Sequence, residues 1–199
     1  YYVERGYITS GAYIPPQKLK DGVVEIRVIE GSLEEIKVNG TRRLNAGYIR
    51  SRLEIATRKP LNRERLLEAL QVLQLNPLIQ NLSAELAAGT RPGVSTLAIE
   101  VREAKTFDAQ FSIDNGRSPS VGSFRRSVQL SEANLLGWGD SLSGSYTNTD
   151  GSNSFDFNYT VPINPRNGTF AFSYGTSDNN VIERPFNTLD IESYSKYYE

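Results

Sequence analysis

Side chains able to perform acid–base, nucleophilic or metal chemistry are few in this sequence. His and Cys are absent, which removes the commonest metal ligands and general bases together with thiolate chemistry. The adjacent carboxylates Glu34 and Glu35 would lie on a strand, where neighbouring side chains point to opposite faces and cannot act as an acid–base pair. No Ser has a plausible base partner or lies in a G-x-S-x-G motif. The sequence therefore predicts neither an enzyme nor a cofactor.

Two further stretches have the composition of ligand-binding loops. GWGDSLSG (residues 137–144) is glycine-rich like a phosphate loop, but no helix follows it and no Lys is placed to reach a phosphate. NTDGSNSFD (residues 148–156) has oxygen-bearing side chains at alternating positions, as a calcium loop does. Both stretches lie between alternating segments, and Asp150-Gly151 is typical of a hairpin. Both are therefore predicted to be turns.

Composition excludes several other classes of protein. The chain has 199 residues and a net charge of −1, and neither half has the basic stripe of a nucleic-acid-binding protein. No run approaches the roughly 18 apolar residues of a membrane-spanning helix. The chain lacks Met, begins without a signal peptide and stops within a strand-like pattern, so we expect it to be part of a longer protein.

A change of composition at residues 103–106 predicts a domain boundary. Before it, residues 32–40 read as a strand, 46–56 and 63–75 as helices, and 79–89 and 95–104 as strands, with Asn62 as the N-cap of the second helix. The order is β-α-α-β-β. Three strands cannot bury an apolar face alone, so the helices should cover one side. Residues 6–14 and 21–31 have the pattern of the last two strands of a similar unit.

After Thr106 the helical period disappears and six alternating segments follow, joined by turn-rich connectors. Strands of this length with no helix between them predict an antiparallel meander. The six segments are residues 107–114, 126–132, 142–148, 155–161, 169–174 and 189–197.

These segments have one apolar or aromatic face and one small, polar face that is almost free of Lys. Aromatic residues also gather towards strand ends, as at Phe107, Tyr146 and Tyr197. A soluble sandwich would instead have outward faces rich in Lys and Glu. An apolar exterior, aromatic girdles and a polar interior are typical of a transmembrane β-barrel. The pattern therefore favours a barrel over a sandwich.

With the residues arranged in this way, the chain resembles a family of outer-membrane proteins. The matching stretches are VVEIRVIEGSLEEIKVNG, YIRSRLEIATRKPLNRERLLEALQVLQLNPLI, LSAELAAGTRPGVSTLAIEVREA and DNGRSPSVGSFRRSVQLSEANLLGWGDSLSGSY. VIEG and NLLGWGD are the most specific motifs. The sequence resembles the transporters of two-partner secretion (TpsB), the hemolysin-activator or filamentous-hemagglutinin-transporter family.

The resemblance implies α+β POTRA domains of order β-α-α-β-β, followed by an antiparallel transmembrane β-barrel of about sixteen strands. Residues 1–31 would end a first POTRA domain, 32–104 would form the second, and 105–199 would supply the first six or so barrel strands. It also implies capture of an exoprotein by periplasmic POTRA domains and its export through the outer membrane of a Gram-negative-type bacterium. The expected partners are the exoprotein and outer-membrane lipid, with no nucleotide and no nucleic acid.

The resemblance also assigns roles to individual residues. By β-augmentation, a client strand would pair with the POTRA strand edges formed by Tyr7, Ile8, Thr9, Ser10, Gly11, Ala12 and Tyr13, and by Asn81, Leu82, Ser83, Ala84, Glu85 and Leu86. The pore would be lined by Asp108, Gln110, Ser112, Ser127, Gln129, Ser143, Ser145, Asp156 and Asn158. Lipid would contact Phe107, Phe111, Phe155, Phe157, Tyr159, Phe170, Phe172 and Tyr174.

Two other functions fit parts of the pattern. A BamA-type factor, which inserts other barrels into the membrane, also joins POTRA domains to a barrel. VIEG followed closely by barrel strands favours the transporter. A soluble, adhesin-like β-domain behind a helical adaptor is the third possibility, and recovery in the soluble fraction would distinguish it.

Overall fold

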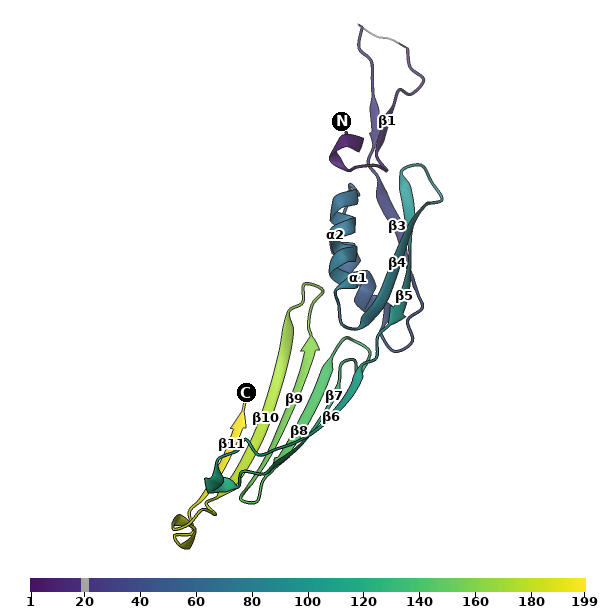
Figure 1. Ribbon diagram of the computed structural model, residues 1–199. Helices are drawn as coiled ribbons and strands as arrows, with labels where there is room; N and C mark the ends of the chain where they lie inside the picture. The colour runs from purple at the N-terminus through teal and green to yellow at the C-terminus, as the bar shows by residue number, and fades with distance from the viewer. Residues whose placement is uncertain (19–21) are drawn as a thin grey trace. The chain divides into compact units, whose positions relative to one another are not determined.

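The computed structural model describes residues 1–18 and 22–199. The chain divides into two compact units, Tyr1–Ala104 and Lys105–Glu199. The first contains all the α-helix among the described residues, and the second is built from strands, turns and two short 3-10 helices (Figure 1).

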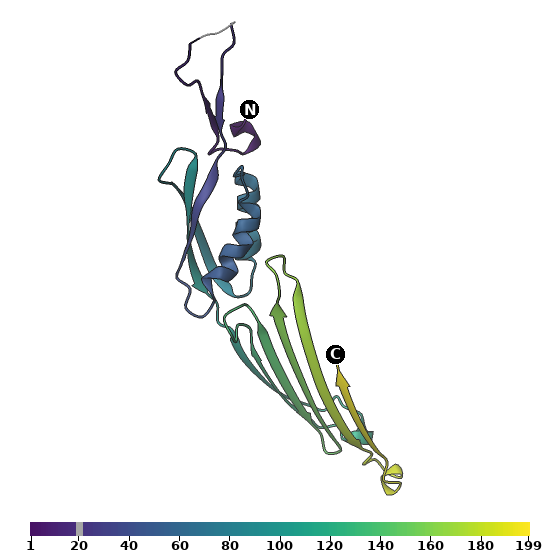
Figure 2. The ribbon, with the colours of Figure 1, turned by 180° about the vertical axis from the view of Figure 1, so that it is seen from behind.

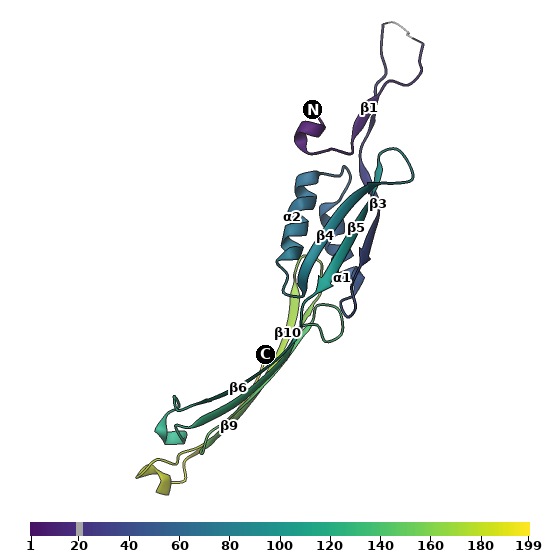
Figure 3. The same cartoon turned by 45° about the vertical axis from the view of Figure 1, so that its right-hand side comes forward.

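The first unit has a three-stranded sheet covered on one side by two helices (Figure 3). The strand order is β3-β5-β4, with β5 parallel to β3 and antiparallel to β4. The predicted order β-α-α-β-β is confirmed. The elements are β3 (Ser32–Asn39), α1 (Ala46–Ala56), α2 (Arg63–Gln74), β4 (Ile79–Ala88) and β5 (Val94–Glu103).

Local sequence explains where these helices begin. The side-chain oxygen of Asn45 accepts from Gly47 N, and that of Asn62 accepts from Glu64 N and Arg65 N at 2.9 and 3.1 Å. Each Asn thereby satisfies backbone donors that the first helical turn leaves free.

The core lies between the helices and the central strand. Ile49 and Leu53 of α1 are fully buried, and so are Leu97 and Ile99 of β5. On α2, Leu66 and Leu73 are buried, while Leu67 is 45% exposed. The apolar face of a sheet needs such a covering layer, and the two helices provide it.

A strand is present in each of the predicted segments 6–14 and 21–31, but both strands are much shorter than predicted. Within the described part of this stretch, β1 (Gly11–Tyr13) pairs with β2 (Arg27–Ile29), Val23 forms an isolated bridge, and a 3-10 helix, η1 (Val3–Arg5), precedes them. Asp21 lies outside the described residues. A ribbon of two strands has little apolar burial to extend its pairing. Residues 1–31 nevertheless bond to the rest of the unit, with Arg63 N donating to Gly6 O at 2.8 Å and Leu61 N donating to Gly31 O at 2.7 Å.

The second unit is a six-stranded antiparallel meander in which each strand pairs with its sequence neighbours (Figure 2). Seen nearly edge-on, it is a single curved layer (Figure 3). The predicted meander is confirmed. Its strands are β6 (Phe107–Asp114), β7 (Arg125–Glu132), β8 (Ser141–Asn148), β9 (Ser152–Pro162), β10 (Thr169–Asn180) and β11 (Glu192–Tyr198), with η2 (Pro119–Val121) and η3 (Phe186–Thr188) in the connections.

Two of these strands extend into stretches that the sequence predicts to be turns. β9 begins at Ser152, and β10 continues to Asn180 instead of ending at Tyr174. The added residues are polar, but they pair on both sides: Asp178 lies opposite Asn153 of β9 and Tyr194 of β11. Backbone pairing therefore outweighs the weak strand propensity of Ser, Asp and Asn. The segments around GWGD and TDG are turns, as predicted.

Within residues 1–18 and 22–199, no helix combines the length and the apolar character that crossing a membrane would require.

Candidate functional site

The first candidate site is the free edge of β4. This strand has one neighbour in the sheet, β5. Leu82 N donates to the side-chain Oε1 of Gln74 at 2.9 Å, so this amide points away from β5. At the other end of the hairpin, Gly89 N donates to Val94 O at 3.0 Å and so points towards β5. Amide direction alternates along an antiparallel strand, so Ala84, Leu86 and Ala88 also point outwards.

An apolar groove lies beside this edge, between α2 and β4. Its volume is about 170 Å³. An apolar cavity of roughly 150 Å³ holds one benzene molecule, so the groove has room for one large side chain. Its lining residues are Ile8, Leu61, Arg63, Leu66, Leu67, Leu70, Ala84, Leu86 and Leu97.

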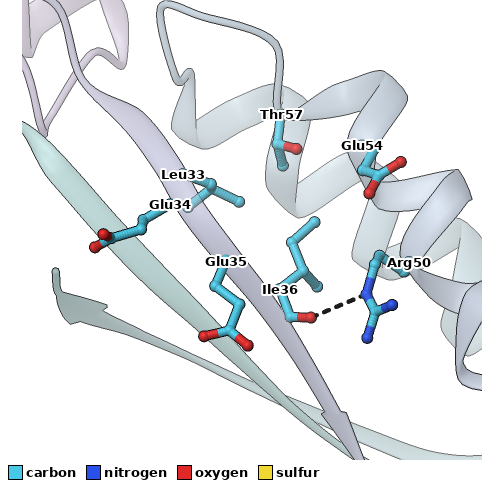
Figure 4. A pocket seen from close by; sticks show the side chains of 7 residues that line it. All are labelled: Leu33, Glu34, Glu35, Ile36, Arg50, Glu54 and Thr57. Atoms are coloured by element: carbon cyan, nitrogen blue, oxygen red, sulfur yellow. Dashed lines mark hydrogen bonds between the residues drawn. The ribbon is translucent and has the colours of Figure 1, made fainter.

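The opposite edge of the sheet, on β3, is covered differently. Arg50 of α1 donates from Nε to the carbonyl oxygen of Ile36 at 3.2 Å (Figure 4). Glu34 and Glu35 have separate partners: Glu34 accepts from the Thr90 amide and hydroxyl, and Glu35 lies 3.6 Å from Lys37 Nζ. The backbone N–H of Thr90 lowers the pKa of Glu34. The two carboxylates therefore bind different groups.

The predicted client-binding residues fall in two places. Asn81, Leu82, Ser83, Ala84, Glu85 and Leu86 all lie in β4, an edge strand. Of the other set, only Gly11, Ala12 and Tyr13 lie in a strand. Tyr7, Ile8, Thr9 and Ser10 do not, and Ser10 N donates to Tyr7 O at 3.1 Å to close a turn. Ile8 instead lines the groove beside α2.

The second candidate site is the polar face of the six-stranded sheet. Residues directly opposite each other in an antiparallel pair share a face. By this register, the nine predicted pore-lining residues, Asp108, Gln110, Ser112, Ser127, Gln129, Ser143, Ser145, Asp156 and Asn158, lie on one face. The eight predicted lipid-facing residues, Phe107, Phe111, Phe155, Phe157, Tyr159, Phe170, Phe172 and Tyr174, lie on the other.

The polar face contains a row of hydroxyl groups that crosses all six strands. Each residue of the row lies opposite the next, and the Ser112 and Ser127 hydroxyl oxygens are 3.1 Å apart. Small neutral side chains of this kind form a hydrated surface without strong attachment points. The row consists of Ser112, Ser127, Thr147, Ser154, Ser177 and Ser195.

Tyr197 lies near the end of β11, as predicted, but on this polar face and not on the apolar face that carries Phe107 and Tyr146. It pairs with Gly175, and its hydroxyl donates to Asp156 Oδ1 at 2.9 Å. The ring occupies the space that a side chain at position 175 would fill. A Gly inside a strand often marks such a close approach, which was the available sequence signal.

The turn between β7 and β8 contains a buried carboxylate that residue patterns did not reveal. Asp140 is 0% exposed and accepts from Leu136 N at 3.0 Å and from the Tyr159 hydroxyl at 3.1 Å. Asn134, also buried, accepts from Gly139 N at 2.9 Å. These bonds hold the NLLGWGD turn in place, while Leu136 and Trp138 remain exposed at its tip.

Among the described residues, no group of three or more Asp and Glu side chains is arranged to hold a metal ion.

Comparison with known proteins gives a family for these two units. The model of the Haemolysin secretion/activation protein ShlB/FhaC/HecB family matches residues 93–199. The chain belongs to this family. A second model, the POTRA domain of ShlB type, matches residues 1–31. The resemblance that the sequence motifs indicate is therefore confirmed.

Individual relatives of the chain are transporters by name. This chain is 28% identical over 145 residues to the heme/hemopexin transporter protein HuxB of Haemophilus influenzae, and the match covers 71% of this chain and 25% of HuxB. The solved CdiB from Escherichia coli is 25% identical with a TM-score of 0.62, covering 98% of this chain and 36% of CdiB. The chain thus spans about a quarter to a third of the length of these relatives.

A solved BamA from Haemophilus ducreyi, lacking POTRA domains 1–3, gives a TM-score of 0.70 at 16% identity. It covers 98% of this chain and 37% of the BamA chain. At this identity the likeness concerns the fold alone. The fold is therefore a POTRA unit followed by antiparallel strands of a transmembrane β-barrel, as the sequence predicts.

Proposed function

We propose that this chain is part of an outer-membrane transporter that captures an exoprotein in the periplasm and exports it through a β-barrel pore. Residues 1–31 end one POTRA domain, residues 32–104 form the next, and residues 105–199 supply the first barrel strands. The match of residues 1–31 to a POTRA model supports the first of these limits. The POTRA domains lie in the periplasm and the barrel in the outer membrane.

The two-faced sheet is the observation that carries this proposal. One face presents Phe, Tyr, Leu and Val in register across the strands, and the other presents mainly hydroxyl and amide side chains, together with the carboxylates of Asp108 and Asp156. An apolar exterior suits lipid, and a polar interior suits water and an unfolded chain. The hydroxyl row supplies hydrogen-bonding groups without the charge that would hold a sliding polypeptide.

Capture of the client takes place at the POTRA sheet edge. The outward backbone groups of β4 are donors and acceptors for an added strand. No nucleotide takes part, so the free energy of this step comes from main-chain hydrogen bonds and from apolar contacts in the neighbouring groove.

The alternative is a barrel-assembly factor of the BamA type, which the fold alone would also suit. The family model and the transporter relatives favour secretion. The two functions separate in a deletion strain. Loss of the full-length gene should abolish release of the exoprotein client and leave the other outer-membrane proteins at normal levels. A general fall in outer-membrane barrels would instead support the assembly function.

Substitution at the edge tests capture within the full-length transporter. Ala84→Pro removes an outward N–H without breaking a bond to β5, so it should lower the amount of exoprotein released while the transporter stays folded in the membrane. Ala84→Ser keeps the amide and should secrete normally. Equal secretion by both variants would argue against capture at this edge.

A further inference from the structure

We propose that Gln74 limits the register of the client, so that the client strand pairs with Ala84, Leu86 and Ala88 and stops before Leu82. This inference rests on the proposed capture of an exoprotein at β4. It narrows the capture edge from the Asn81–Leu86 stretch expected from the sequence to the half of β4 nearer the β4–β5 hairpin.

The hydrogen bonds at the two ends of β4 determine which amides a client can reach. Leu82 N donates to Gln74 Oε1, and Gly89 N donates to Val94 O. These bonds have opposite directions and are seven residues apart, as strict alternation requires. The outward amides are therefore those of Leu82, Ala84, Leu86 and Ala88, and the first is already occupied by Gln74.

The position of Gln74 allows it to block pairing of a client strand beyond Ala84. It is the last residue of α2, and the side chain reaches eight residues along the chain to the beginning of β4. A strand that continued past Ala84 would have to displace this side chain and replace its hydrogen bond. Such an exchange yields little net free energy, because one hydrogen bond is lost for each one made.

The two faces of β4 specify the side chains of the client. Ala84 and Leu86 lie opposite the buried Ile99 and Leu97, on the face that the helices cover. A client residue beside them shares this face and meets the groove lined by Leu67 and Leu70.

The opposite face has a different character. It carries Ser83, Glu85 and Ala87, which are exposed. The client segment is thus an extended strand with apolar side chains at every second position and polar ones between.

The β3 edge offers a less continuous site. Ile36 O already accepts from Arg50, in the middle of that strand. The hollow beside it is lined by Glu34, Glu35 and Glu54 together with Arg50, so it is charged where the α2–β4 groove is apolar (Figure 4). A client strand with apolar side chains at every second position should therefore bind at β4 in preference to β3.

Single-amide hydrogen exchange on the full-length transporter in nanodiscs tests the register. The probe is a blocked hexapeptide that alternates threonine and valine, added at millimolar concentration. The control peptide has the same composition with its valines grouped together. The protein variants are Gln74→Ala and the matched control Gln71→Ala, an exposed Gln of the same helix.

The expected results follow from the hydrogen bond between Leu82 N and Gln74. Without peptide, Gln74→Ala should speed exchange at Leu82 about tenfold, corresponding to one hydrogen bond, and Gln71→Ala should not. The alternating peptide should slow exchange at Ala84, Leu86 and Ala88 in the unaltered protein and leave Leu82 unchanged. In Gln74→Ala, protection by the peptide should extend to Leu82. The grouped peptide should protect much less.

The possible failures are distinguishable. If the peptide slows exchange at Leu82 in the unaltered protein, or protects the same amides in Gln74→Ala as in the unaltered protein, then Gln74 does not limit the register. Capture at β4 would remain supported. Equal protection by both peptides would overturn the alternating specificity. No protection of any β4 amide by the alternating peptide would overturn capture at this edge, and with it the inference.

Discussion

The hydroxyl of Tyr197 donates a hydrogen bond of 2.9 Å to Asp156 Oδ1, across the intervening residue Gly175. Three strands, β9, β10 and β11, are joined in this way on the polar face. An ideal Cβ at position 175 would lie 2.1 Å from Cε1 of the Tyr197 ring and 2.8 Å from Asp156 Oδ1. A side chain at position 175 would therefore displace the end of the Tyr197 ring, which covers this strand Gly as aromatic side chains do in other sheets.

Gly175→Ala should displace Tyr197 and break its bond to Asp156. We expect a loss of about 1–3 kcal/mol in the free energy of unfolding, the usual cost of overpacking. Tyr197→Phe, which keeps the ring and removes the hydroxyl, should cost only about 0.5–1.5 kcal/mol. Denaturant unfolding of the full-length protein in detergent compares the two. A Gly175→Ala protein as stable as the unaltered one would show that the ring does not fill this space.

Asn62 links the beginning of α2 to the residues that precede the sheet. Its Oδ1 caps the helix, and its Nδ2 donates to Arg5 O at 3.0 Å. Asn62→Ala should lose both interactions and cost about 1–2 kcal/mol. Asn62→Asp keeps the capping oxygen but loses the donor to Arg5, so it should be the milder change. Denaturant unfolding followed by far-UV circular dichroism gives the order of stability of the two variants. Equal unfolding midpoints for Asn62→Ala and Asn62→Asp would exclude a contribution from the capping oxygen.

The sequence predicted those features that depend on local pattern. Alternation of side chains divided the barrel strands correctly into two faces, and Asn62 marked the first residue of a helix. It could not predict that β10 continues to Asn180, because Ser177 and Asp178 have low strand propensity and are ordered by partners on both sides.

Contacts between residues far apart in the sequence could not be predicted from it either. The bond from Leu82 N to Gln74 and the ring of Tyr197 over Gly175 depend on how a helix end or a neighbouring strand packs in three dimensions. The short β1–β2 pairing shows the opposite error: among the described residues 22–31, the regular strand is limited to Arg27–Ile29, which have a partner in β1.

Glu103 gives the POTRA unit a pH-dependent stability. Its carboxylate accepts from the backbone N–H groups of Arg42, Leu44 and Arg43 at 2.6–3.1 Å. Burial raises the pKa of Glu103, but these donors and the charge of Arg42 outweigh it and hold the pKa below its ordinary value. The ionised form therefore stabilises the fold above the unfolded pKa of about 4.3, and the contribution disappears as the pH falls through the folded value.

Glu103→Gln should accordingly be less stable than the unaltered protein at neutral pH, and the difference should vanish in acid. The exposed Glu68→Gln on α2 serves as the control and should show little difference at any pH. Denaturant midpoints measured from neutral pH to below pH ~4 provide the comparison. A destabilisation by Glu103→Gln that is independent of pH would mean that the charge of the carboxylate is not involved.

Ser127 and Val128, neighbours in the middle of β7, test whether the two faces of the sheet meet water and lipid. Ser127 belongs to the hydroxyl row, and Val128 lies between Phe111 and Tyr146 on the apolar face. The chain has no Cys, so Ser127→Cys and Val128→Cys each introduce a single thiol into it. In the full-length protein in membranes, a membrane-impermeant maleimide should label position 127 and leave position 128 unlabelled, because a thiolate forms only where water reaches the thiol. A fluorophore at position 128, attached after unfolding, should in turn be quenched by brominated lipid. Equal labelling of both thiols would place water on both faces and support a soluble β-domain instead of a barrel wall.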